Sequence, residues 1–305
     1  MRIFVLLFIT ALIQLSCEQK KDPIAVAETT EVKERFIYAP GQEYKDYWFN
    51  GTAEISSYTL SQARYGELRE GQSVLVFVTE PFSVKSNTKA DRPTADDPSV
   101  LKLNFTKKFN TGIYPYSMMN SSFFPFEDGQ HSLKIATSVQ EWCGQTYMEL
   151  KNSDAFEIAI NSYFEGESRT TFKTEKVLLE DDLWSMIRLQ PDNLPEGSFK
   201  ALPGFFYLRL KHINTKPQLA EGTMVKTDST SSYTIQYPEL DRSLQIDFET
   251  AFPHRILGWS ESYLKSYNSA ETITTEGKLI KSIRSDYWRR NSNKDQVLRD
   301  SLGLK

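Results

Sequence analysis

Short segments in which apolar and polar residues alternate recur along most of the chain. The clearest lie at 47–58, 73–79, 101–105, 113–119, 132–138, 156–163, 205–211, 233–237, 244–248 and 272–283. Each is bounded by Gly, Pro, Asn or Asp, which is typical of β-strands. Because helix-length patterns do not separate them, the sequence predicts an all-β fold: an antiparallel curved sheet, or a partly open barrel or sandwich.

One internal segment has helical character instead. Glu180 opens an acidic stretch, which suits the positive end of a helix dipole. Leu183, Trp184 and Ile187 then fall on one face of the following turns. Pro191 is expected to end this helix, because proline cannot continue it.

The C-terminal end also predicts a short helix. Asn293 is expected to cap it, Gln296 occupies the reciprocal position of a capping box, and Gly303 ends it. Two polar segments, 85–99 and 221–232, contain few apolar residues and predict exposed loops.

The N-terminal residues predict where in the cell the protein is located. Arg2 is followed by an apolar run at 3–15, which is shorter than the roughly 20 residues that a membrane-spanning helix needs. With the small residue Ser16 after it, this pattern is typical of a secretory signal peptide. Cys17 directly follows and resembles the lipidated cysteine of bacterial lipoproteins. We expect residues 1–16 to be a lipoprotein signal peptide and Cys17 to carry the lipid.

The rest of the chain divides into two parts. Residues 17–40 are charged and have little aromatic or periodic apolar content, which predicts a disordered tether. Residues 41–305 are expected to form a single β-rich domain. If this domain has two lobes, the division is expected near 191–204.

Composition and cysteine count narrow the possible functions. The formal net charge of −4 argues against nucleic-acid binding, which needs basic clusters. There are two cysteines. If Cys17 carries lipid, Cys143 is left alone and the mature fold has no intramolecular disulfide. We expect Cys143 to be a structural thiol beside a core Trp142.

No catalytic motif in the sequence is complete. Residues 141–144 begin like a thioredoxin active site, but Thr146 stands where the second cysteine is required. Residues 258–262 come within one residue of the hydrolase pattern G-x-S-x-G, with Ser262 in place of the final Gly. The three histidines form no zinc-binding pattern. We therefore expect no enzymatic activity, no cofactor and no metal.

The candidate ligand contacts are aromatic and basic side chains. Tyr287, Trp288, Arg289 and Arg290 combine two rings with two guanidinium groups, a set that can hold an anion or a glycan. Trp142 is the further candidate contact.

Five stretches of the chain carry a resemblance to a known family. They are Tyr47-Trp48-Phe49-Asn50-Gly51, Gln62-Ala63-Arg64-Tyr65-Gly66, residues 107–116, Gln140-Glu141-Trp142-Cys143-Gly144 and residues 294–304. They resemble a family of uncharacterised Bacteroidetes lipoproteins over nearly the whole mature chain. Members often carry the name "septum formation inhibitor Maf". The Ser-x-Ser-Pro-Arg-Arg loop of true Maf nucleotide pyrophosphatases does not occur here. The resemblance thus implies a location in the cell envelope and a β fold. It implies no catalytic residues.

These observations together predict a protein of the bacterial outer membrane that is lipid-anchored and faces the periplasm or the cell surface. Its expected role is non-enzymatic, in binding or in envelope assembly. The expected partners are the membrane, through the N-terminal lipid, and a lipid, glycan, peptide or envelope protein. The alternative is a hydrolase that acts on envelope glycan, lipid or peptide through dispersed Asp, Glu or Ser residues.

Overall fold

Strands dominate the structure, a computed structural model that describes residues 41–127, 130–266 and 269–304. The described strands form a 16-stranded sheet in the order β10-β11-β12-β13-β14-β15-β16-β1-β2-β4-β5-β6-β7-β8-β9, and β3 pairs with β2. Neighbours are antiparallel, apart from the parallel pair β10 and β11. The strand bounds are β1 (Ala53–Arg64), β2 (Glu67–Ser83), β3 (Thr88–Lys89), β4 (Ser99–Thr111), β5 (Tyr114–Pro125), β6 (Lys134–Glu141), β7 (Gly144–Asn152), β8 (Phe156–Ser162), β9 (Thr170–Thr174), β10 (Leu178–Leu179), β11 (Gly197–Leu202), β12 (Gln218–Lys226), β13 (Thr230–Tyr237), β14 (Arg242–Glu249), β15 (Ile256–Leu264) and β16 (Thr272–Ser285).

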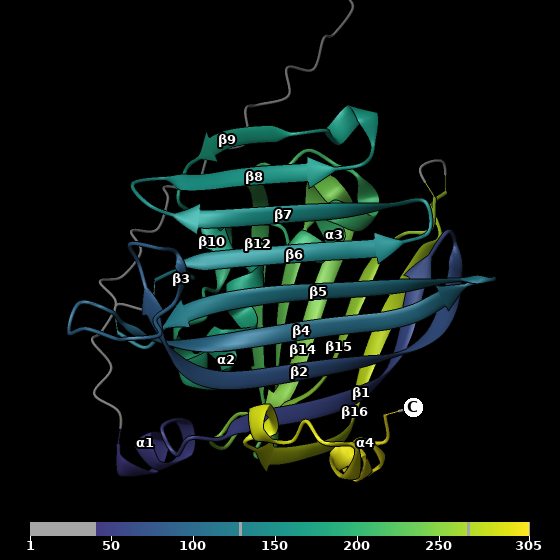
Figure 1. Cartoon of the computed structure of the whole chain (residues 1–305). Coiled ribbons are helices and arrows are strands. Elements are labelled where there is room, and N and C mark those ends of the chain that lie inside the picture. Colours follow the sequence, from purple (N-terminus) through teal and green to yellow (C-terminus); the bar gives the residue numbers. More distant parts are fainter. Residues whose placement is uncertain (1–40, 128–129, 267–268, 305) are drawn as a thin grey trace, which may run out of the picture. The chain divides into compact units, whose positions relative to one another are not determined.

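The sheet curves so that its two halves face each other across a shared core (Figure 1). Phe105 of β4 contacts Trp259 of β15, with ring centroids 5.2 Å apart. Both rings also contact Trp184 of the short helix α2 (Leu183–Leu189), at 4.9 Å and 5.6 Å. The sheet is not closed, since β9 and β10 end the strand order and do not pair with each other among the described residues. The predicted antiparallel curved sheet is therefore confirmed.

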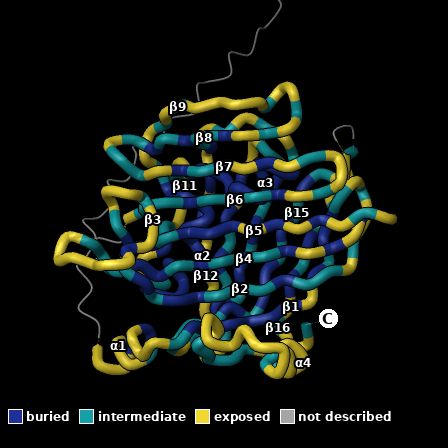
Figure 2. The backbone as a smooth tube through the Cα atoms, in the orientation of Figure 1, coloured by how far each residue is buried: buried dark blue, intermediate teal, exposed yellow. Residues whose placement is uncertain are grey.

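The alternation in the sequence has the expected physical cause. Successive side chains of a strand point to opposite faces. In β14, Leu244, Ile246 and Phe248 are buried, whereas Gln245 and Asp247 between them are not. Figure 2 shows buried positions alternating with less buried ones along labelled strands such as β4 and β5. One face of each strand thus supplies the core, and burial of apolar area on that face is the main favourable term in folding.

Helices other than α2 are short as well. They are α1 (Gln42–Trp48), α3 (Phe205–Lys211) and α4 (Val297–Ser301), with 3-10 turns at η1 (Glu165–Glu167), η2 (Glu180–Asp182), η3 (Pro191–Asn193), η4 (Pro238–Leu240), η5 (Tyr287–Arg289) and η6 (Asn293–Gln296). None of these helices is long and apolar enough to cross a membrane. The described residues all belong to one compact unit. The predicted signal peptide 1–16 and tether 17–40 lie outside the described residues.

The prediction of a strand at 205–211 is wrong, because this segment is α3. All of its residues except Lys211 are buried. Phe206 and Leu210 belong to the main hydrophobic core. Phe205 and Leu208 belong to a second hydrophobic cluster, which also contains Met148 and Ile158. A helix buried on several sides loses the polar face that distinguishes its period from that of a strand.

The loop predicted at 221–232 and the strand predicted at 47–58 also need correction. Residues 221–232 lie mostly in the hairpin of β12 and β13, whose outward side chains are mostly polar, and only the turn around 227–229 is unpaired. Tyr47 and Trp48 belong to α1, and the strand begins at Ala53. The adjacent rings made the whole segment look strand-like, although Trp48 packs on the core from a helix.

Both predicted helices are present in the structure. The acidic stretch forms η2 and continues into α2, which ends before Pro191. At the C-terminus, η6 and α4 form the predicted helix, and Gly303 follows with a φ of 65°. The cap is one residue earlier than predicted: Ser292 and Asp295 form the capping box.

Candidate functional site

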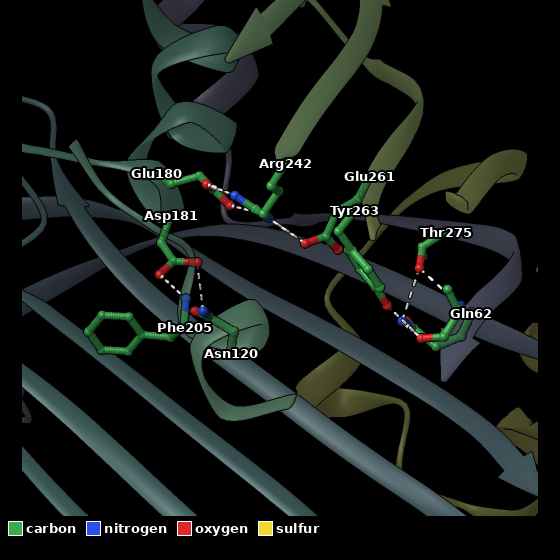
Figure 3. A network of polar contacts seen from close by, with 10 residues as sticks. Gln62, Asn120, Glu180, Asp181, Phe205, Arg242, Glu261, Tyr263 and Thr275 are labelled. Carbon is green, nitrogen blue, oxygen red and sulfur yellow. Dashed lines mark hydrogen bonds and ion pairs between the residues drawn. The ribbon is translucent and has the colours of Figure 1, made fainter. Parts of the chain in front are cut away.

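A cluster of charged side chains lies inside the curved sheet. We call it the interior charge cluster; it consists of Lys107, Glu180, Asp181, Arg242 and Glu261, all buried or nearly so. Arg242 binds Glu180 through both terminal nitrogens, at 2.5 and 2.7 Å. Its Nε donates to Glu261 at 2.9 Å (Figure 3). The guanidinium thus holds two carboxylates that approach it from η2 and β15.

The environment shifts the pKa values of this cluster in opposite directions. Burial raises the pKa of Glu261, but the charges of Arg242 and Lys107 outweigh burial and lower it. Burial lowers the pKa of Lys107. Burial and the charge of Glu180 together raise the pKa of Asp181 to about 8. At neutral pH Asp181 is therefore mostly protonated, and two basic groups face two glutamates.

Local backbone geometry places Asp181 and Glu180 against the start of α3. Asp181 accepts hydrogen bonds from the backbone N–H of Phe205 at 3.0 Å and from Nδ2 of Asn120 at 2.9 Å (Figure 3). Gly204 permits this approach, because a Cβ there would lie 2.4 Å from Oε1 of Glu180.

The space beside the interior charge cluster is small. The cavity has a volume of about 30 Å³, and its lining includes all five residues of the cluster. A volume of this size holds roughly one or two water molecules. Arg242 and its two glutamates are thus paired with one another, and the ammonium group of Lys107 lies over the rings of Phe105 and Phe206. The cavity beside them has no room for a substrate.

A second buried ion pair joins α2 to β1. Arg188 binds Glu54 through both terminal nitrogens, one of them at 2.7 Å, and its Nε donates to the carbonyl of Pro253 at 2.9 Å. Burial raises the pKa of Glu54, but Arg188 outweighs it and the pKa falls to about 2. Neither charge of this pair is without a partner.

Large apolar side chains gather outside the core, at one end of the strands. We call the set Tyr65, Ile113, Tyr114, Trp142 and Tyr163 the hydrophobic rim. Antiparallel order brings the ends of β1, β4, β6 and β8 to this same edge of the sheet. Ile113, Tyr163 and Trp142 are 86%, 77% and 69% exposed.

Tight turns fix the positions of these side chains. Arg64 pairs with Glu67, so β1 and β2 are joined by a two-residue turn at Tyr65 and Gly66, both with positive φ. Gly112 supplies the positive φ in the turn beside Ile113. Two-residue turns of this kind match the twist of a hairpin. Tyr65 and Ile113 thus sit on tight hairpin tips.

Contacts between the tips join the rim into one surface. The rings of Tyr114 and Trp142 stack, with centroids 6.2 Å apart and planes at 30°. The ring of Tyr163 lies over Gly144, where a Cβ would come within 2.9 Å of it. The rim therefore spans the tips of neighbouring hairpins.

A polar depression lies on the outer face of β6, β7 and β8, beside the same hairpin tip. We call it the outer hollow. Its volume is about 500 Å³, and its lining consists of Ser138, Gln140, Gln145, Thr146, Tyr147, Asn161, Ser162, Ser168 and Arg169. The inner face of these strands is covered by α3, where Met148 and Ile158 pack with Leu208. Hence the hollow opens away from the core.

The structure separates the ligand contacts that the sequence predicted. Trp142 lies on the hydrophobic rim. Tyr287, Trp288 and Arg289 form η5, just beyond the end of β16, where Ser285 pairs with Ala53 at the start of β1. Since β1 spans 12 residues and rises about 3.3 Å per residue, its two ends lie roughly 35 Å apart, with the hydrophobic rim at one end and η5 at the other.

Three further residues that the sequence analysis singled out are Arg290, Cys17 and Cys143. Arg290 is exposed and pairs with Asp286 at 3.0 Å. The predicted lipid site Cys17 lies outside the described residues. The expectation of a structural Cys143 beside a core Trp142 is wrong, because both are exposed at the tip of the β6–β7 hairpin. A two-residue turn leaves nothing to cover them.

The other motifs are structural. Residues 258–262 lie inside β15, and Oγ of Ser262 bonds to Oγ1 of Thr274 at 2.7 Å. Among the described residues, no group of three or more His, Cys, Asp or Glu side chains could hold a metal ion. Sequence reasoning missed the interior charge cluster and the outer hollow. The acidic stretch that opens at Glu180 does begin a helix, as predicted, but the sequence does not indicate that its three carboxyl groups are buried.

Comparisons with known proteins give one solved structure to report. No protein-family model and no curated protein matches the chain. The chain is similar to a solved structure titled "Crystal Structure of Beta-barrel-like Protein of Domain of Unknown Function DUF1849 from Brucella abortus", at 8% sequence identity and a TM-score of 0.46. The match covers 76% of this chain and 98% of that chain. A likeness at this level carries no statement about activity.

Proposed function

We propose that this chain is a lipid-anchored protein of the bacterial cell envelope that binds a ligand without changing it chemically. The observation that carries the proposal is the hydrophobic rim, where Ile113, Trp142 and Tyr163 stand exposed on adjoining hairpin tips. Clusters of exposed apolar side chains mark interaction sites. Trp and Tyr are enriched among the residues that contribute most to binding.

The position of the rim supports this role. The structure describes the chain from α1 onward, and α1 leads into the start of β1, whereas Tyr65 follows the end of β1. The predicted tether at 17–40 would therefore join the domain at the end opposite the rim. With Cys17 in the membrane, the rim would remain available to a ligand.

The second candidate function, hydrolysis of envelope material, has one observation in its favour. Asp181 has a pKa raised to about 8, and such shifts cluster at catalytic sites. Against it, the cavity beside Asp181 holds only about 30 Å³. The carboxylates around it are already bound by Arg242. A substrate could reach them only if this network opened, so binding is the better-supported function.

Photo-crosslinking in the producing bacterium tests the proposal. A photo-reactive phenylalanine analogue replaces Ile113 on the rim in the full chain. The comparison variant carries the same analogue in place of Trp288, the exposed candidate contact that the sequence predicted, which lies at the other end of β1. We expect irradiation to attach a lipid, glycan or peptide at position 113 and none at position 288, with the adduct identified by mass spectrometry.

Adducts of equal yield at both positions, or at position 288 alone, would contradict a specific role for the rim. A lack of adducts at position 113 would have the same meaning. Release of a hydrolysed product that depends on Asp181 would favour the hydrolase instead.

A separate variant tests the anchor. In Cys17→Ala the thiol that would accept the lipid is absent, so we expect the protein to leave the membrane fraction or to stay unprocessed. Cell fractionation and the mass of the N-terminal peptide measure this. Full membrane retention of the variant with an unchanged N-terminal mass would disprove lipidation at Cys17.

A further inference from the structure

The outer hollow is built from two rows of polar side chains. The Cα register pairs Ser138 with Tyr147, and Tyr147 with Asn161, across β6, β7 and β8. Gln140 and Gln145 form the neighbouring row, next to the tip that carries Trp142. Residues directly opposite on one face lie about 5 Å apart. The hollow is therefore a patch of closely spaced hydrogen-bonding groups.

These groups are available to a ligand. Within the described part of the chain, the side chains of Gln140, Gln145 and Asn161 make no hydrogen bond to another residue, and all three are exposed. Each amide offers two N–H donors and a carbonyl acceptor. Tyr147 is held in place by its O–H, which donates to Glu149 at 2.5 Å, so its ring is presented in a fixed orientation. One fixed ring and several free amides together suit a ligand rich in hydroxyl groups.

A charged side chain in the lining sets a second requirement that the ligand must meet. Arg169 is the charged residue in the lining, and it makes no ion pair with another described residue. It precedes Thr170, which pairs with Ile160, so Arg169 falls beside Asn161 at the end of the first row. A guanidinium binds a carboxylate through two parallel hydrogen bonds.

We infer that the outer hollow binds an oligosaccharide that carries a carboxylate group. A lipid chain is disfavoured because the lining contains no aliphatic side chain. An extended peptide adds to a sheet edge and needs apolar pockets for its side chains, whereas the hollow lies on a sheet face and offers amides and hydroxyls. The volume of about 500 Å³ lies within the usual range for small-ligand sites.

The chemistry of the lining indicates binding and not cleavage. Glycosidases use a pair of carboxyl groups that flank the bond they break. The lining of the outer hollow contains no Asp, Glu, His or Cys. This inference names the ligand class of the non-enzymatic function proposed above and rests on it.

Calorimetric titration of the full chain, in a detergent without a sugar head group, tests the inference. The probes are acidic oligosaccharides released from the envelope of the producing bacterium, hexagalacturonate, neutral maltohexaose and an acidic hexaglutamate peptide. We expect the acidic oligosaccharides to bind more tightly than maltohexaose and hexaglutamate. Gln140→Ala combined with Gln145→Ala should weaken that binding about tenfold or more.

Arg169→Gln has a matched control. Lys151→Gln removes the same charge from an exposed site on the outer face of β7 that does not line the hollow. We expect Arg169→Gln to weaken binding of the acidic oligosaccharide about tenfold or more, and Lys151→Gln by less than about twofold. Binding of maltohexaose should not respond to Arg169→Gln.

Three results would overturn the inference: no oligosaccharide binds, hexaglutamate binds as tightly as the acidic sugars, or both charge variants weaken binding equally. If crosslinking at position 113 still succeeds in that case, the proposed binding function stands and only its ligand class is wrong. If crosslinking fails as well, both proposals fall.

Discussion

Polar side chains occupy both faces of the sheet, and the two faces differ in how far those groups are engaged. On the inner face, Arg242 holds Glu180 and Glu261, and Asp181 accepts two hydrogen bonds. On the outer face, Gln140 and Gln145 make no side-chain hydrogen bond to any other described residue. Buried polar groups must be satisfied within the fold, because water does not reach them. Exposed ones can remain available to a ligand, so it is the outer face that has capacity for binding.

The largest effect should follow from breaking the inner network. Arg242→Met leaves two buried carboxylates without their partner, and removing one member of a buried ion pair costs about 3–5 kcal/mol. We expect the free energy of unfolding in urea to fall by that amount. Arg289→Met, at an exposed site, is the control and should change it by less than about 0.5 kcal/mol. Equal losses in both variants would show that the network is not what makes Arg242 important.

The next largest effect is a dependence of the free energy of unfolding on pH, which Asp181 on the inner face should produce. The pKa of Asp181 is raised from 3.8 to about 8, so between these pH values the folded protein keeps a proton that the unfolded chain has lost. The free energy of unfolding should therefore fall as pH rises through this window, by about 1.4 kcal/mol for each pH unit. Asp181→Asn is neutral at every pH and should remove this component.

Urea titrations of wild type and Asp181→Asn at pH 5, 6, 7 and 8 measure the difference. We expect the variant to gain on the wild type steadily as pH rises. The pKa of His254, which burial lowers, also contributes to the pH dependence, but it does so in both proteins and cancels in the comparison. Parallel curves over the whole range would mean that Asp181 is ionised in the folded protein.

A smaller loss of stability is expected from a substitution at Gly204, where the backbone approaches the interior charge cluster. A Cβ at position 204 would lie 2.4 Å from Oε1 of Glu180, and that carboxylate is held by Arg242. Gly204→Ala should therefore cost about 1–3 kcal/mol, as overpacking does in other cores. Gly166→Ala is the control, since nothing lies within 4 Å of a Cβ there. Thermal unfolding of the two variants gives the comparison, and a neutral Gly204→Ala would show that Glu180 can move aside.

The same contrast explains what the sequence could and could not predict. Most strands were predictable, because a two-residue period follows from one buried face. The helix α3 was not, because burial on several sides erased its polar stripe. The interior charge cluster escaped detection because Glu180 and Arg242 are separated by 62 residues, and only the curvature of the sheet joins them.

The outer hollow was hidden for a different reason. Gln140, Gln145 and Asn161 occupy ordinary outward positions of β6, β7 and β8, where polar residues are expected. Only the register between β6, β7 and β8 shows that they form adjacent rows. Trp142 was singled out from the sequence for its residue type, but its place on a rim required the order of the hairpins.

The smallest expected effect tests the outer face itself. Gln145→Ala should change the free energy of unfolding by less than about 0.5 kcal/mol, because its side chain is exposed and makes no hydrogen bond within the described structure. Asn120→Ala is the matched change on the inner face. It removes the hydrogen bond to Asp181 from a buried amide and should cost about 1–3 kcal/mol. Urea unfolding of both variants measures the gap. If Gln145→Ala proved as costly as Asn120→Ala, the amides of the outer hollow would be part of the fold's own support, and they would not be available to a ligand.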